Sequence, residues 1–293
     1  MASNKVALIT GGASGMGLAV ATHLSQNPIW TVHILDLQPP STPIPNSTFH
    51  KCNVTDEPGL ARIFADIYAS MQRLDFVFAN AGIAERANFY STSSDAAEEP
   101  ELPLKGLHAL IDVNLKSVIT TTYLAAHYMS KSASSNTSGT GDGAANDKSI
   151  VITASCGGLY PSYYSPIYTA TKHAVVGFMR AIAPWYFYKK GIRVNAICPG
   201  TVKTGLLSQA EWANFPEEYF TPVEKIARTV AMLVEGKDDE VSRAEGDDIL
   251  WGKAVEISGE RHYYRDAVEF CDEGMAKVMG STNIEVLDNV QES

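Results

Sequence analysis

The chain has 293 residues, of which 45% are hydrophobic and 19% are charged. This composition provides a large apolar core, so it excludes intrinsic disorder for most of the chain and favours a single α/β domain. The 33 acidic residues exceed the 23 Lys and Arg residues, and the formal net charge of -10 repels nucleic-acid phosphates and anionic lipid. The charge therefore argues against a nucleic-acid partner.

The cysteines and histidines predict no disulfide framework and no metal site. The cysteines are too widely spaced for a zinc knuckle or a compact set of disulfides, and the histidines show neither HxH nor HExxH spacing. No signal-peptide pattern precedes the first apolar run, and no stretch of about eighteen apolar residues predicts a membrane span. We therefore expect a cytoplasmic protein with reduced thiols. The cysteines are Cys52, Cys156, Cys198 and Cys271.

Short β-branched and apolar runs alternate with longer helical patterns along the chain. Strands are predicted at 6–10, 32–35, 49–54, 76–79, 150–154, 194–197 and 254–257. Helices are predicted at 16–25, 58–71, 105–130, 165–188 and 222–235, and loops at 85–103 and 130–148. Consecutive βαβ units predict a doubly wound parallel sheet of the Rossmann type, with helices on both faces. Pro184 lies inside the fourth helical pattern, and we expect it to kink or end that helix about one turn after Arg180.

A glycine-rich turn, Thr10 to Gly17, follows the first predicted strand and leads into a helix. Glycines let the backbone approach a pyrophosphate, which binds at the helix N-terminus, although a glycine cluster alone can be only a turn. Asp36 ends the next strand, 36 - 17 = 19 residues beyond the last glycine, where a carboxylate accepts ribose hydroxyls and repels a 2′-phosphate. Positions 11–17 and 37–38 hold no Lys or Arg, so the sequence favours NAD over NADP. The alternative for Asp36 is a loop-capping residue.

Tyr168 and Lys172 stand at i and i+4, so they share one face of a predicted helix. Tyr186 and Lys190 have the same spacing. Only the first pair has a serine thirteen residues upstream: Ser155 directly follows a predicted strand, at the edge where open parallel sheets bind ligands. A nearby ammonium lowers the pKa of a phenol, which is otherwise about 10, so Tyr168 is the candidate acid/base. The second pair is interpreted as a solvated helix end.

Motifs in this order resemble the short-chain dehydrogenase/reductase family over about residues 5–259. Within it, the segments 122–131, 168–178 and 196–200 are most similar to the 15-hydroxyprostaglandin dehydrogenases, NAD-linked enzymes that oxidise an allylic alcohol of a lipid. The motifs are Thr10-Gly11-x-x-x-Gly15-x-Gly17, Asn80-Ala81-Gly82, Asn114, Ser155, Tyr168-x-x-x-Lys172 and Pro199-Gly200.

The resemblance implies a role for each matched residue. Tyr168 becomes the general acid/base, and Lys172 its activator and a ribose ligand. Ser155 becomes the donor to the substrate oxygen, and Asn114 the anchor of a water leading to Lys172. The family also implies a homodimer or homotetramer. The implied cofactor-binding residues are Gly11, Ser14, Gly15, Met16, Gly17, Asp36, Asn53, Val54, Asn80, Ala81, Gly82, Tyr168, Lys172, Pro199, Gly200, Val202 and Thr204.

Two positions depart from the pattern. Asn53 stands where the family usually has an Asp that holds the adenine amine, and we expect weaker binding there because the amide oxygen still accepts a hydrogen bond. Ser165 stands where the prostaglandin enzymes have a Gln that supports the substrate hydroxyl. This second departure places that substrate in doubt.

The segment 204–222 is apolar and follows the predicted nicotinamide strand, where the family builds a mobile substrate cover. We expect Leu206, Leu207 and Trp212 to contact a lipophilic substrate, with Tyr160 on the opposite wall; the alternative is ordinary core packing. One domain then spans residues 1–259, and residues 260–293 form a tail with a helix and a frayed end.

These observations predict an oxidoreductase that transfers a hydride between NAD and a lipophilic secondary alcohol or ketone. One alternative is a family member that uses the same residues for a non-redox biosynthetic step. The other is a catalytically silent nucleotide-binding scaffold, against which the complete set of Asn114, Ser155, Tyr168 and Lys172 argues.

Overall fold

The strands and helices of the computed structural model follow the predicted alternation; the described residues are 5–90, 104, 106–132, 147–238 and 249–284. The strands are β1 (Lys5–Thr10), β2 (Trp30–Asp36), β3 (Ser47–Lys51), β4 (Phe76–Ala79), β5 (Lys148–Thr153), β6 (Ile192–Pro199), β7 (Ala254–Ser258) and β8 (Arg261–Arg265). The α-helices are α1 (Gly15–Ser25), α2 (Glu57–Met71), α3 (Leu107–Ile111), α4 (Ser117–Lys131), α5 (Pro166–Lys190), α6 (Gln209–Trp212), α7 (Val223–Glu235) and α8 (Glu273–Gly280). A π-helical turn, η1 (Asp112–Lys116), joins α3 to α4, and two 3₁₀ turns are η2 (Cys156–Gly158) and η3 (Glu217–Tyr219).

The strands form one sheet in the order β3-β2-β1-β4-β5-β6-β7-β8. Every neighbouring pair is parallel except β7 and β8. The central strands β5 and β6 are buried along their whole length, which explains why they appear in the sequence as continuous apolar runs. The doubly wound α/β sheet predicted from the sequence is confirmed.

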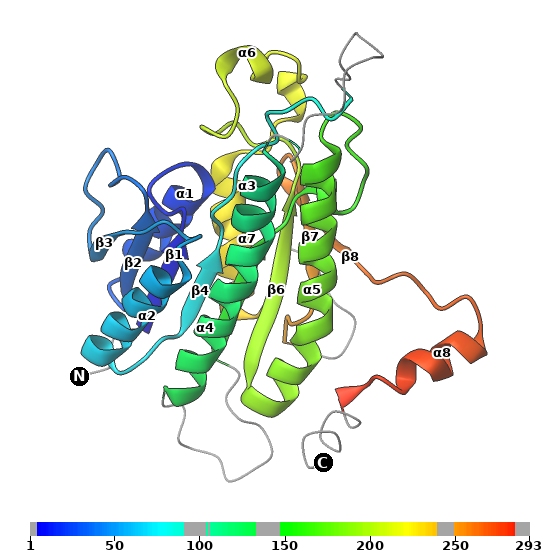
Figure 1. Ribbon diagram of the computed structural model, residues 1–293. Coiled ribbons are helices and arrows are strands. Elements are labelled where there is room, and N and C mark those ends of the chain that lie inside the picture. Colours follow the sequence, from blue (N-terminus) through cyan, green and yellow to red (C-terminus); the bar gives the residue numbers. More distant parts are fainter. Residues whose placement is uncertain (1–4, 91–103, 105, 133–146, 239–248, 285–293) are drawn as a thin grey trace.

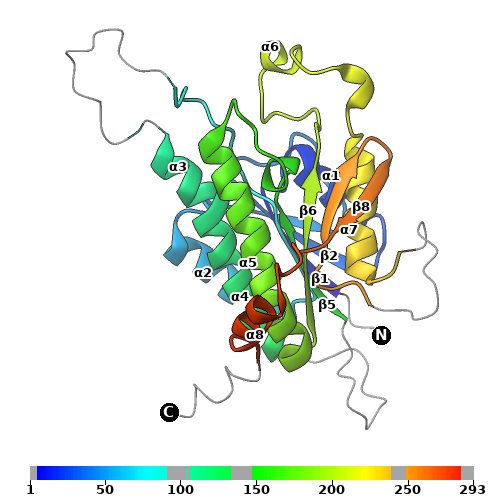
Figure 2. The same ribbon diagram turned by 90° about the vertical axis from the view of Figure 1, so that its right-hand side faces the viewer.

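Helices cover both faces of the sheet, so the molecule has three layers (Figures 1 and 2). On one face α2, α4 and α5 pack through Phe64, Met129 and Val175. On the other face α1 and α7 pack through Val20 and Val230. The segment with α6 stands above the carboxyl ends of the strands, where ligands bind in sheets of this kind (Figure 1).

The sheet extends beyond residue 259, where the sequence analysis ended the domain. Gly259, with φ +54°, turns the chain back so that β8 pairs antiparallel with β7, and the tail therefore begins with a strand instead of the expected helix. Along β8 only His262 is buried, and this short alternation was too brief to be recognised as a strand. The helix of the tail is α8, which buries none of its residues and lies beside the body in Figure 1.

Helix α5 continues through Pro184 to Lys190, so of the two expected outcomes, a kink or an end at Pro184, the end was wrong. Proline removes one N–H donor from a helix of 25 residues. Buried Met179 and Ala183 before Pro184, and the partly buried Tyr186 after it, all pack against the core, which stabilises the helix on both sides of the proline.

Two expected loops lie largely outside the described residues, at 91–103 and 133–146. Within the described part of the chain, every helix is too short or too polar to cross a membrane. The same part contains no cluster of three His, Cys, Asp or Glu side chains placed to bind a metal ion.

Candidate active site

The glycine-rich turn between β1 and α1 leaves no room for side chains. A Cβ atom on Gly17 would lie 2.1 Å from the carbonyl oxygen of Gly11, and a Cβ on Gly15, which has φ +51°, would lie 3.1 Å from the Thr204 side chain. The Ser14 side chain makes no capping hydrogen bond at the start of α1. A bare backbone at a helix N-terminus is the cradle that a pyrophosphate needs, so these residues fit a dinucleotide.

Asp36 is tied to this turn. Its Oδ2 accepts a hydrogen bond from the backbone N–H of Ala13 at 3.0 Å, and its Oδ1 accepts one from Leu37 at 2.7 Å. The carboxylate therefore caps the loop, as the alternative interpretation proposed, and retains acceptor capacity for ribose hydroxyls. Lys51 of β3 is in register with Asp36, a cation that the sequence analysis did not consider.

Asn80 and Ala81 pack directly against the turn. The Asn80 Nδ2 donates hydrogen bonds to the carbonyl oxygens of Thr10 and Gly11, both at 3.2 Å, and its Oδ1 accepts one from the Thr153 hydroxyl at 3.1 Å. A Cβ on Gly11 would lie 3.0 Å from the Ala81 Cα. The asparagine of the Asn80-Ala81-Gly82 motif thus joins β1, β4 and β5 beneath the glycine-rich turn.

Asn53 and Val54 follow β3 at the predicted adenine side. The Asn53 Oδ1 accepts hydrogen bonds from both the N–H, at 3.1 Å, and the hydroxyl, at 2.9 Å, of Thr55. Val54 is buried. The amide oxygen expected to receive an adenine amine is therefore already engaged in a local turn.

Asn114 lies in the π-turn η1 and is fully buried. Its Oδ1 accepts from the Ile83 N–H at 2.8 Å, and its Nδ2 donates to the Ile83 carbonyl oxygen at 2.9 Å. A Cβ on Gly82 would lie 3.4 Å from the Asn114 Oδ1 and 3.8 Å from the Lys172 Nζ. Asn114 and Lys172 thus meet at the loop after β4, and π-turns are frequent at functional sites.

Lys172 is only 3% exposed, and its Nζ donates to the carbonyl oxygen of Thr153 at 2.9 Å. Burial lowers the pKa of Lys172 to about 8. Its Nζ lies 5.6 Å from the centre of the Tyr168 ring. The cation predicted to act on the phenol is therefore adjacent to it.

Ser155 and Tyr168 flank Gly157. A Cβ on Gly157 would lie 3.5 Å from both the Ser155 Oγ and the Tyr168 Cε1. Burial raises the pKa of Tyr168, and the Ser155 hydroxyl beside the phenol opposes that rise. Ser155 lies two residues beyond β5, and its Oγ accepts a hydrogen bond from the Gly157 N–H at 3.1 Å. The four predicted catalytic residues are thus gathered at the carboxyl edge of β4 and β5.

The second tyrosine–lysine pair lies at the other end of α5. Burial raises the pKa of Tyr186, and the Nζ of Lys190 lies 5.4 Å from the ring centre of Trp185 instead of approaching Tyr186. In the described structure no backbone hydrogen bond joins this pair to the glycine-rich turn or to the Asn80-Ala81-Gly82 motif.

The predicted cover continues from β6 through Val202 and Thr204. The Trp212 Nε1 donates to the Thr204 carbonyl oxygen at 2.9 Å, and the ring packs against Phe215 and Phe220. Trp212 is 8% exposed, so it supports the cover from within. Leu206 and Leu207 remain partly exposed. The Tyr160 hydroxyl, expected on the opposite wall, donates to the Glu256 Oε2 at 3.1 Å.

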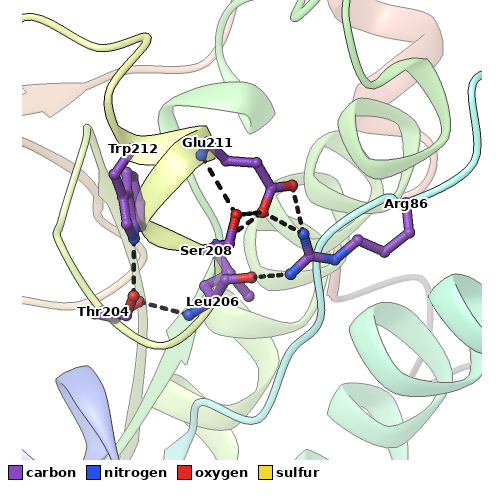
Figure 3. Close-up of polar contacts among 6 residues, drawn as sticks. All are labelled: Arg86, Thr204, Leu206, Ser208, Glu211 and Trp212. Carbon is purple, nitrogen blue, oxygen red and sulfur yellow. Dashed lines mark hydrogen bonds and ion pairs between the residues drawn. The ribbon is translucent and has the colours of Figure 1, made fainter.

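A salt bridge joins the cover to the loop after β4 (Figure 3). The Arg86 guanidinium donates to both carboxylate oxygens of Glu211 and, at 2.7 Å, to the Leu206 carbonyl oxygen. Glu211 also accepts from the N–H and hydroxyl of Ser208 at 2.7 and 2.6 Å, so it completes a capping box at α6. We call these contacts the Arg86–Glu211 clasp.

The sequence analysis missed the clasp. The Ser208-x-x-Glu211 spacing of a capping box was a readable signal for α6. The partner Arg86 lies 125 residues away, and no local pattern pairs the two.

Comparison with known proteins identifies the family. The family model for short chain dehydrogenases matches residues 5–214, and the chain belongs to this family. The family predicted from the sequence motifs is thereby confirmed.

Two relatives match most of the chain. The short-chain dehydrogenase/reductase prx7 of Penicillium rubens is 45% identical over 289 residues, which cover 92% of this chain and 97% of the relative. The 15-hydroxyprostaglandin dehydrogenase (NAD+) of Rattus norvegicus is 30% identical over 281 residues, which cover 88% of this chain and 92% of the relative. The solved structure of ElxO with NADP bound has a TM-score of 0.67 at 24% identity, covers 87% of this chain and 97% of its own, and shares the fold.

Proposed function

We propose that this oxidoreductase transfers a hydride between NAD and a lipophilic secondary alcohol or the matching ketone. The observation that carries the proposal is the convergence of four side chains on the loops after β4 and β5. Asn114 and Lys172 lie against Gly82, and Ser155 and Tyr168 lie against Gly157. A scaffold that bound nucleotide without chemistry would not require this set.

The residues that hold NAD in this proposal are those of the glycine-rich turn, Asp36 and the Asn80-Ala81-Gly82 motif. The backbone N–H groups of the turn from Gly11 to Gly17 receive the pyrophosphate, and Asp36 receives the ribose hydroxyls. Thr204, in contact with Gly15, belongs to the nicotinamide side. When bound, NAD would accept a hydride, that is, two electrons and one proton, from the carbinol carbon of the substrate.

The chain's own residues manage the proton. In alcohol oxidation the Tyr168 phenolate accepts the hydroxyl proton of the substrate, and in ketone reduction the phenol returns it. The Ser155 hydroxyl donates to the substrate oxygen. Burial alone would keep Tyr168 neutral, so the Lys172 ammonium, 5.6 Å from the ring centre, is needed to favour the phenolate.

Asp36 supports NAD as the cofactor, since a carboxylate at the ribose repels a 2′-phosphate. The rat relative carries NAD+ in its name, whereas ElxO was solved with NADP. Lys51 is in register with Asp36, and its positive charge is the feature of this region that opposes a preference for NAD over NADP. We place NAD first because the Asp36 carboxylate is fixed against the turn itself.

A lipophilic substrate is supported by the partly exposed Leu206 and Leu207, which the Arg86–Glu211 clasp holds over the carboxyl edge of the sheet. Trp212 is buried inside the cover, and the Tyr160 hydroxyl is paired with Glu256, so of these two residues only the exposed ring of Tyr160 is free for substrate. Ser165 pairs with Ser162 at 2.9 Å and cannot replace the Gln that supports a prostaglandin hydroxyl. We therefore propose a different lipophilic alcohol. A homodimer in the cytoplasm completes the proposal.

The test is a panel of lipophilic secondary alcohols and ketones, assayed with NAD(H) and with NADP(H) through the absorbance of the reduced nicotinamide. We expect turnover of at least one bulky alcohol or ketone with NAD(H). Binding of NAD without turnover of any compound would favour the non-redox alternative, and absence of dinucleotide binding would contradict the proposal.

A further inference from the structure

Glu85 is a buried carboxylate in the loop after β4, three residues beyond Gly82, and it is only 9% exposed. No motif of the sequence analysis includes it. Its neighbour Arg86 has the opposite charge and lies at the surface, where it forms the clasp with Glu211. Two consecutive residues thus contact opposite walls of the site.

Glu85 caps helix α5, which carries Tyr168. The helix begins at Pro166, and the side chain of its N-cap residue Ser165 caps no backbone N–H group. The acceptor comes instead from Glu85, whose Oε2 accepts a hydrogen bond from the Tyr168 N–H at 2.8 Å. Because a helix N-terminus attracts negative charge, this contact holds the first turn of α5 against the loop.

The same loop is held on its other side by Asn114. Both backbone polar groups of Ile83 pair with the Asn114 side chain, at 2.8 and 2.9 Å. Only one residue separates Ile83 from Glu85. The backbone of Tyr168 is therefore fixed to the segment that also fixes Asn114.

The second oxygen of Glu85 makes no contribution of this kind. Its Oε1 is buried and has no hydrogen-bond partner in the described structure. An unpaired buried carboxylate oxygen lowers the free energy of unfolding, and such groups occur at functional sites, where geometry takes precedence over stability. The capping contact with Tyr168 is the interaction that accounts for Glu85.

We propose that Glu85 is a positioning residue for Tyr168, which sets the place of the phenol relative to Ser155 and Lys172 by holding the Tyr168 backbone. The inference rests on the proposed function, since it takes Tyr168 as the acid/base. It assigns Glu85 no contact with substrate or cofactor. A displaced acid/base slows the chemical step while cofactor binding is retained.

The test compares Glu85→Leu with Glu85→Gln. Leucine removes the acceptor, whereas glutamine keeps an oxygen for the Tyr168 N–H and removes only the charge. We expect Glu85→Leu to lower kcat by about tenfold to a hundredfold with KM for NAD unchanged, and Glu85→Gln to retain most of the activity. Comparable losses in both variants, or full kcat in Glu85→Leu, would overturn the proposal.

Two readouts separate this proposal from the proposed function. Hydrogen exchange at the Tyr168 amide, followed by mass spectrometry, should accelerate in Glu85→Leu and not in Glu85→Gln. Ultraviolet titration of the Tyr168 phenol, with Tyr168→Phe as the blank in each background, should give a higher pKa in Glu85→Leu because alignment with Ser155 is lost. Neither measurement needs turnover, so both would test the role of Glu85 even if the protein oxidised no alcohol. Unchanged exchange and titration would overturn it.

Discussion

The Nζ of Lys172 lies 5.6 Å from the centre of the Tyr168 ring and is enclosed by protein, so the cation that the proposed chemistry requires is kept where water cannot solvate it. Burial lowers the pKa of Lys172 from 10.5 to about 8. The unfolded chain therefore binds a proton more tightly than the native chain, and this mismatch destabilises the fold. The destabilisation is complete below pH 8 and fades as the pH rises toward 10.5.

Lys172→Met is expected to increase the free energy of unfolding at pH 7 by up to about 3 kcal/mol, less the lost hydrogen bond to Thr153, while abolishing activity. The gain should shrink as the pH approaches 10.5. Denaturant unfolding of both proteins at pH 7 and pH 10 checks it. A methionine variant that is less stable than the parent at both pH values would contradict a buried ammonium.

The Arg86–Glu211 clasp holds the cover, and we expect salt rather than acid to loosen it. The Ser208 hydrogen bond, with Arg86, lowers the pKa of Glu211 to about 2. The carboxylate contribution is thus complete above its ordinary pKa of 4.5 and disappears only as the pH falls through about 2. Both side chains are exposed, so ionic strength screens the pair.

Arg86→Gln is expected to raise KM for a lipophilic substrate about two- to fivefold at low salt, the range of an exposed ion pair. The difference from the parent should vanish in molar salt, because the parent then loses the same interaction. Lys203→Gln, which removes an exposed ion pair with Glu217, is the matched control. A KM in the parent that is independent of salt would refute this role of the clasp.

We expect the choice between NAD and NADP to depend on Asp36. We expect the parent to bind NAD at least tenfold more tightly than NADP, about 1.4 kcal/mol. Asp36→Asn keeps an acceptor for the Ala13 N–H and removes the charge that repels a 2′-phosphate. This variant should therefore bind NADP more tightly, which reduces the difference in affinity between NAD and NADP. Asp36→Ala should also weaken NAD. Direct titration of both cofactors measures this, with Lys51→Gln as a control for the cation in register. Equal affinities of the parent for NAD and NADP would contradict the assignment of NAD as the preferred cofactor.

The sequence predicted the features that follow from local pattern. Parallel strands were recognisable because burial on both faces makes them continuously apolar, and the glycine turn because Gly17 tolerates no side chain. The order of the motifs favoured Tyr168 and Lys172 over Tyr186 and Lys190 as the candidate catalytic pair, and that role stays a prediction. These are properties of residues near one another in sequence or of a family pattern.

Long-range polar contacts could not be predicted in the same way. Glu85 and Tyr168 are 83 residues apart, and Arg86 and Glu211 are 125 apart, so only the fold brings them together. Strand β8 was missed because its pairing with β7 depends on the turn at Gly259. Trp212 was predicted to contact substrate, but an indole near a site can either bind a ligand or support a loop. The sequence alone does not distinguish these two roles.

The most direct measurement of the central claim compares Tyr168→Phe with Tyr186→Phe, two variants that each remove one phenolic oxygen from the same helix. If Tyr168 carries the proton, Tyr168→Phe should lower turnover about a hundredfold or more with NAD affinity unchanged, because the ring and its packing remain. Tyr186→Phe should stay near the parent rate. Retention of most activity by Tyr168→Phe, with NAD bound normally, would contradict the assigned chemistry.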